Sequence, residues 1–147
     1  MTHNTEPLID LRVEDGHLRG GIFLESQLTN VEVLFDLESE GGTQELDDFK
    51  DIVSSYRTFI IELLAETKLS ILKERISKEI TDASYSQSDS NARKEDYQEL
   101  QEDLTIIKIS FYREDMVLNF VAEKVYKDAH IYCQLDKDWV VDDIHMG

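Results

Sequence analysis

The chain has 147 residues, of which 41% are hydrophobic and 32% are charged. This composition is typical of a folded domain and lies outside the ranges of disordered and membrane-embedded chains. Its 32 acidic and 15 basic residues give a formal net charge of −17, which disfavours direct binding to nucleic acid or to an anionic membrane. The same charge would attract a basic protein, although it also serves solubility alone.

The length fits one domain, 1–147, with a single core. No apolar run approaches the roughly 18 residues of a membrane-spanning helix, and the first residues form neither a basic nor an apolar signal region. The single cysteine, Cys133, has no second thiol for a disulfide or a zinc motif. We therefore expect a cytoplasmic protein, of bacterial or viral type, without a cofactor.

Strands are predicted in the first part of the chain, at 8–38. Apolar and polar residues alternate over 8–14, as in a strand with one wet face. Asp15-Gly16 is a hairpin signal, and Gly20-Gly21 predicts a bulge or bend in the second strand. The second and third strands are predicted at 18–24 and 31–37.

A helical segment is predicted over 43–80, with Thr43 as its N-cap. An unbroken helix of this length would extend about 57 Å, nearly twice the width of a small domain. Its apolar residues change sides near the middle, and the second group consists of Leu69, Leu72, Ile76 and Ile80. We therefore predict a break between Glu66 and Ser70, with both halves packed on the domain. The alternative is a straight helix whose second group forms a homodimer or partner surface.

The chain becomes polar over 81–103, which predicts a mobile loop with at most a short helical turn at 93–101. Strands return over 104–145, and short turns between them favour antiparallel neighbours. The whole pattern predicts an α+β fold: an antiparallel sheet of about six to seven strands with the central helical segment packed on one face.

Recognised catalytic patterns do not occur in the sequence. The four histidines lack metal-ligand spacing, and there is no nucleophile elbow or phosphate-binding glycine loop. We therefore predict neither an enzyme nor a metal site. An alternative is a small hydrolase that uses His130 with Asp128 or Asp136. Cys133 is predicted to be an ordinary strand residue, because no nearby base or positive charge is evident to lower its pKa.

Two acidic groups are candidate partner-binding surfaces. Carboxylates on the polar faces of the first and third strands would form an acidic sheet surface if these strands are neighbours: Asp10, Glu14, Glu32, Asp36 and Glu38. In the polar loop, Asp96 and Glu99 belong to a second group that would form a flexible arm. The alternative for both groups is ordinary solvation.

Two segments near the C-terminal end resemble an uncharacterised bacterial family, a domain of unknown function of similar length. His130-Ile131-Tyr132-Cys133-Gln134-Leu135-Asp136 is similar to that family's strand of the form His-Ile-x-x-x-Leu-Asp, and Ile144-His145-Met146-Gly147 is similar to its closing strand. Ala129 departs from the glycine expected before the histidine. Small acidic families of this kind resemble the immunity proteins encoded beside bacterial toxins, which implies a protein-binding role.

The leading hypothesis is therefore an immunity or antitoxin-like inhibitor that covers a basic toxin domain through charge complementarity. A second hypothesis is a DNA-mimicking inhibitor of a nucleic-acid enzyme, in which carboxylates stand in for phosphates. The two differ in geometry, because mimicry needs a double row of carboxylates and toxin binding needs a compact patch.

Overall fold

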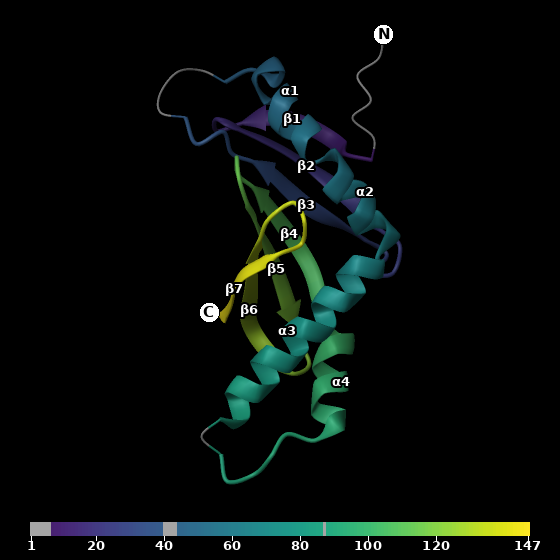
Figure 1. The fold of residues 1–147 in the computed structure, drawn as a ribbon. Helices are drawn as coiled ribbons and strands as arrows, with labels where there is room; N and C mark the ends of the chain where they lie inside the picture. Colours follow the sequence, from purple (N-terminus) through teal and green to yellow (C-terminus); the bar gives the residue numbers. More distant parts are fainter. Residues whose placement is uncertain (1–6, 40–43, 87) are drawn as a thin grey trace.

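The structure is a computed structural model and describes residues 7–39, 44–86 and 88–147. It shows an α+β fold in which a seven-stranded sheet carries a layer of helices (Figure 1). The strands are β1 (Ile9–Glu14), β2 (His17–Leu24), β3 (Thr29–Phe35), β4 (Thr105–Phe111), β5 (Met116–Ala122), β6 (Tyr126–Leu135) and β7 (Val141–Met146). Among the described residues, no helix is both long and apolar enough to span a membrane.

The strands lie in the sheet in the order of the chain, from β1 at one edge to β7 at the other. Every neighbouring pair is antiparallel except β3 and β4, which are parallel. A parallel pair needs a long crossover, and the helices supply it. They are η1 (Leu46–Phe49), α1 (Lys50–Ser55), α2 (Arg57–Ala65), α3 (Thr67–Tyr85) and α4 (Lys94–Asp103).

The predicted break in the helical segment is confirmed. Glu66 stands between α2 and α3 with a left-handed backbone, at φ 62°. Both apolar groups on either side of it reach the core, as Leu63 and Leu69 illustrate. The predicted N-cap, Thr43, lies outside the described residues, and Glu45 caps η1 instead, with its backbone N–H donating to Asp48 at 2.8 Å.

The homodimer surface predicted as an alternative is wrong. Leu69, Leu72, Ile76 and Ile80 are each at most 7% exposed and belong to the core. The turn at Glu66 redirects α3 so that its apolar side faces the sheet. No second copy can reach these side chains without unfolding the helix layer.

The predicted polar loop at 81–103 is largely helical. The helix α3 continues to Tyr85, and α4 begins at Lys94 after a short connection. The buried Leu100 anchors α4, and the hydroxyl of Ser77 donates to the carbonyl of Tyr97. A single buried apolar residue does not produce a recognisable helical periodicity in the sequence. The helix α4 is therefore stabilised mainly by its tertiary contacts.

The core lies between the helices and one face of the sheet. Side chains along β5 alternate between buried and half-buried, and the buried set packs against the helices. Phe111 is at the centre: its ring stacks on Phe35 at a centroid distance of 4.6 Å and also meets the rings of Tyr56 and Phe59. The ring of Trp139 extends this aromatic cluster by stacking on Phe59, at a centroid distance of 4.5 Å.

The bulge expected at Gly20-Gly21 lies on the opposite strand. β2 pairs with β3 without interruption through both glycines, whereas the register of β1 shifts between Ile9 and Arg12. The irregular part of β1 passes close over Gly20, and a Cβ at this position would lie 2.8 Å from the carbonyl oxygen of Ile9. The glycine is needed for this close approach.

Gly20→Ala is therefore expected to lower the free energy of unfolding by about 1–3 kcal/mol, because the edge strand must move. Gly21→Ala is the matched control, since the nearest atom to its added Cβ is 3.5 Å away, and its effect should stay within about 0.5 kcal/mol. Urea denaturation of both variants gives the comparison. Equal losses in the two variants would contradict this explanation.

Candidate functional site

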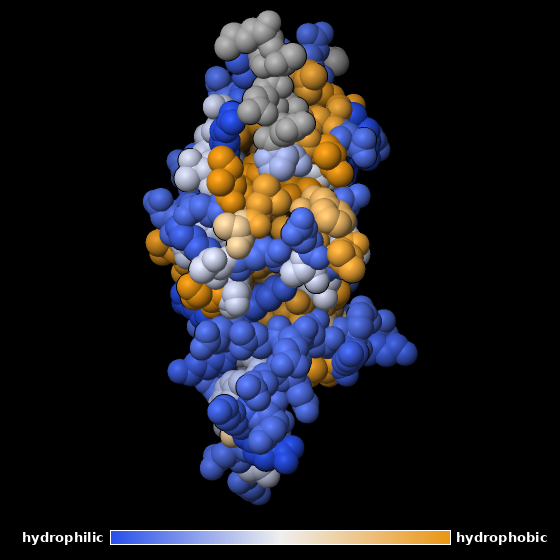
Figure 2. All heavy atoms as spheres, turned by 90° about the vertical axis from the view of Figure 1, so that its right-hand side faces the viewer, coloured by the Kyte–Doolittle hydropathy of each residue, from blue (hydrophilic) through white to orange (hydrophobic). Residues whose placement is uncertain are grey.

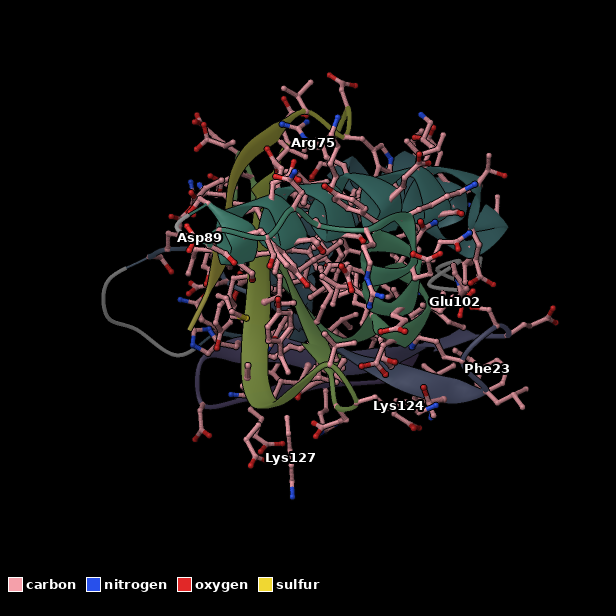
Figure 3. All side chains as sticks on the ribbon, turned by 90° about the horizontal axis from the view of Figure 1, so that it is seen from below. Phe23, Arg75, Asp89, Glu102, Lys124 and Lys127 are labelled. Atoms are coloured by element: carbon pink, nitrogen blue, oxygen red, sulfur yellow. The ribbon has the colours of Figure 1, made fainter. Side chains whose placement is uncertain are left out.

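One face of the sheet carries no helix within the part of the chain that the structure describes. Figure 3, a view from below, shows the helices on one side of the strands and Phe23, Lys124 and Lys127 on the other. Strand pairing places side chains of this open face in cross-strand rows; one row runs from Glu32 through Lys108 to residues on β5, β6 and β7. The open face is thus a polar surface of mixed charge.

The predicted acidic sheet surface is only partly assembled. β1 and β3 are not neighbours, because β2 lies between them. The cations of this region sit among the carboxylates: Arg12 pairs with Glu14 at 2.9 Å and Arg19 with Glu32 at 3.3 Å. Local cations therefore offset much of the negative potential that a partner would meet here.

The remaining predicted residues of this surface are Asp36, Glu38 and Asp10. Asp36 follows β3 and lies 3.9 Å from Nδ1 of His17. Glu38 accepts a hydrogen bond from the backbone N–H of Arg113 at 3.2 Å, and Asp10 stands in the irregular part of β1 with φ 55°. His17 also pairs with Glu14, so Asp36 and Glu14 lie on either side of one histidine, whereas Glu38 contacts the β4–β5 turn.

A more uniform acidic surface lies on α4. Glu95, Glu99 and Glu102 stand at i, i+4 and i+7, so they share one side of the helix, and all three are exposed. Within the described ranges, none of the three takes part in an ion pair. We call Glu95, Glu99 and Glu102 the α4 stripe; Figure 3 shows Glu102 at the rim of the molecule.

Asp96, which was predicted with Glu99 to bind a partner, has a structural role in α4. Its carboxylate accepts the backbone N–H of Arg93 at 2.8 Å and the hydroxyl of Tyr85 at 3.1 Å. The hydrogen bond from the Arg93 backbone is the main cause of the lowered pKa of Asp96. Asp96 therefore caps α4, and Glu99 alone of the two lies on the α4 stripe.

The residues of the hydrolase alternative do not come together. Nδ1 of His130 lies 3.0 Å from Oδ1 of Asn119. Asp136 follows the C-terminal end of β6 and closes the β6–β7 turn by accepting the backbone N–H groups of Asp138 and Val140. No hydrogen bond joins His130 to Asp128 or Asp136 in the described structure.

His130 instead belongs to an aromatic row on the open face. The ring of Tyr132 lies between the imidazoles of His130 and His145, at centroid distances of 6.1 and 5.2 Å. The carboxylate of Asp143 is 2.7 Å from Nδ1 of His145. The spacing of His130 and Tyr132 places them on one face, but the contribution of His145 depends on the β6–β7 register, which sequence reasoning did not supply.

Cys133 is fully buried on the helix-facing side of β6, as an ordinary strand residue. Burial raises the pKa of its thiol to about 12, so the reactive thiolate is not populated near neutral pH. Residues 7–39, 44–86 and 88–147 contain no group of three or more His, Cys, Asp or Glu residues arranged to hold a metal ion.

A groove of about 590 Å³ lies between β1 and the helices η1, α1 and α2. Its apolar lining includes Leu8, Leu11, Leu18, Leu46, Val53 and Ile60. Charged side chains at its border are Asp47, Lys50, Asp51 and Arg57. Figure 2 shows that apolar side chains gather in the upper half of the molecule, whereas the lower half is hydrophilic. Sequence reasoning missed the groove because strand and helix residues far apart in the chain form it.

A scan against protein-family models finds no match, and searches of curated proteins and of solved structures find none either. The resemblance to small acidic toxin-immunity families stays a prediction that these comparisons do not test.

Proposed function

We propose that this chain is a protein-binding inhibitor that neutralises a basic partner, in the manner of a bacterial immunity protein or antitoxin acting in the cytoplasm. The observation that supports the proposal is the α4 stripe. Its three carboxylates are exposed, follow one helix face and lack ion-pair partners among the described residues. On a chain of net charge −17, such a stripe attracts clustered lysine and arginine side chains and raises the rate of association.

The sheet carboxylates make a weaker contribution to this proposal. Glu14 and Glu32 already have arginine partners at 2.9 and 3.3 Å. A basic partner would have to replace these ion pairs, so the net gain would be small. We therefore assign the first contact with the partner to α4.

DNA mimicry has less support from the arrangement of charges. It would need a second row of carboxylates beside the α4 stripe. On α3, which packs against α4, basic residues interrupt the carboxylates; Arg75, for example, lies 3.7 Å from Glu79. A single stripe beside a helix of mixed charge favours a compact protein contact.

The test begins with capture of basic proteins from the native host on the immobilised chain, followed by kinetics with the purified partner. The association rate should fall by at least about tenfold between about 0.05 and 0.5 M NaCl, since exposed charges are then screened. The variant Glu95→Gln/Glu99→Gln/Glu102→Gln should associate about tenfold more slowly at the lower salt concentration.

The matched control is Glu25→Gln/Glu114→Gln/Glu123→Gln. It removes the same charge from three exposed turn positions and should change the rate by less than about twofold. An acidic partner, or an association rate that does not respond to salt, would refute the proposed function. Equal slowing by both triple variants would refute the assignment to α4.

A further inference from the structure

We infer that the groove between β1 and the helices η1, α1 and α2 binds an extended segment of the partner, with alternating apolar and basic residues, which pairs with β1 as an additional strand. This inference rests on the proposed function, because it names how a basic partner is held. Initial attraction would come from the α4 stripe, whereas the groove would supply a specific contact.

Within the described residues, β1 forms a free edge of the sheet. β1 pairs with β2 on one side, and on its other side the described chain has no strand. The two-residue turn at Asp15 and Gly16, both with positive φ, makes Glu14 and His17 a hydrogen-bonded pair. Hydrogen-bonding direction alternates along the regular part of the strand, Arg12 to Glu14, so the backbone groups of Val13 point away from β2 and are available to another strand.

The groove beside β1 has an apolar lining on both sides. Leu8 and Leu11 line it from the β1 side, and Leu46 and Val53 line it from the helices. Leu46 is 58% exposed, a large fraction for a leucine beside other apolar residues. An added strand would point every second side chain into this groove, in the way that peptide-binding domains of the strand-addition type receive their ligands.

The charged residues near the groove and along β1 favour a basic segment. At the border of the groove, Asp47 and Asp51 stand with Lys50 and Arg57. The β1–β2 hairpin adds Asp10 and Asp15, both exposed; the ion pair of Arg12 and Glu14 nearby is already balanced. The charged residues that line the groove balance one another, but along β1 and its turn the carboxylates of Asp10, Glu14 and Asp15 outnumber the single cation, Arg12. This excess favours lysine and arginine as the outward-facing residues of a strand beside β1.

A second copy of this chain fits less well. Two copies paired through β1 would bring the carboxylates of one hairpin close to those of the other, and like charges on adjacent strands are destabilising. A small apolar ligand would use the groove but leave the β1 edge unpaired. The test separates these occupants.

The probe is a labelled nonapeptide of alternating lysine and valine, compared with a lysine–serine peptide and with a lysine–valine peptide N-methylated at alternate residues. Fluorescence anisotropy should show binding of the first peptide and at least about tenfold weaker binding of the other two, because they lack the apolar side chains or the backbone donors. Hydrogen exchange at the amide of Val13 should slow when the first peptide binds.

Leu46→Ser should weaken binding of the lysine–valine peptide about tenfold. The matched control is Ile71→Ser, since Ile71 is a similarly exposed aliphatic residue on α3 at 62%, and its effect should be below about twofold. Binding without slower exchange at Val13, equal binding of the N-methylated peptide, or a dimer in sedimentation that Leu46→Ser dissociates would each overturn the inference.

With the captured partner, the two proposals fail separately. If Leu46→Ser leaves partner affinity unchanged while neutralising the α4 stripe slows association, the groove is not the docking site and the proposed function stands. If the partner is not basic, the proposed function fails, and the peptide and exchange data decide on the groove alone.

Discussion

Phe111→Ala is expected to lower the free energy of unfolding by about 3–5 kcal/mol, as typical for loss of a fully enclosed aromatic ring. The Phe111 side chain is fully buried and lies against three other rings, with Phe35 almost parallel to it at an interplanar angle of 11°. Tyr56 and Phe59 reach it from the helix layer at 4.7 and 6.2 Å. The cavity would therefore open where the helices meet the sheet.

The matched control is Phe23→Ala. Phe23 is 45% exposed on β2, so its removal should cost less than about 1 kcal/mol. Urea denaturation followed by circular dichroism measures both variants against the unchanged protein. A loss below about 2 kcal/mol for Phe111→Ala would show that the core closes around the cavity or that the rings are less tightly packed than described.

Tyr56→Phe should cost about 1–3 kcal/mol, because it removes the side-chain donor from the half-buried carbonyl of Tyr112, whereas the carbonyl of Asp115 keeps the backbone N–H of Tyr112. The Tyr56 hydroxyl donates to the carbonyls of Tyr112 and Asp115 at 2.5 and 2.8 Å, and so fastens the helix layer to the β4–β5 turn. Burial, with smaller contributions from the carboxylates of Asp115 and Glu38, raises the pKa of Tyr56 to about 12.

The raised pKa gives this prediction a signature at alkaline pH. A tyrosine whose pKa is higher in the folded state stabilises the protein fully below its unfolded pKa, near 10, and loses that contribution as the pH rises towards 12. Over this range, stability should fall more steeply for the unchanged protein than for Tyr56→Phe, by at most about 1.4 kcal/mol per pH unit. Cys133 titrates in both proteins, so the comparison isolates Tyr56. Parallel curves would show that the hydroxyl is not held as described.

Local patterns in the sequence predicted much of the fold. The Asp15-Gly16 turn and the break at Glu66 follow from backbone preferences and from the period of apolar residues, both of which are local. The helix α4 was predicted only as a short helical turn within a loop, because its stability comes from tertiary anchors such as Leu100.

The candidate sites were less accessible to sequence reasoning. Neutralisation of Glu32 by Arg19 depends on which strands are neighbours and in which register, and the groove depends on how the helices lie over β1. The composition gives the total charge of the chain. The exposed row of carboxylates on α4 is recognised only in the structure.

The parallel pair β3–β4 has a consequence for how the chain folds. Each three- or four-strand meander can form from residues close in sequence, but the seam between them joins Glu32 to Lys108 and Phe35 to Phe111 across the whole helical crossover. Such distant pairing carries the largest loop-closure entropy in the molecule and slows folding. We therefore expect the centre of the sheet to be assembled last, with the two halves already present as separate units.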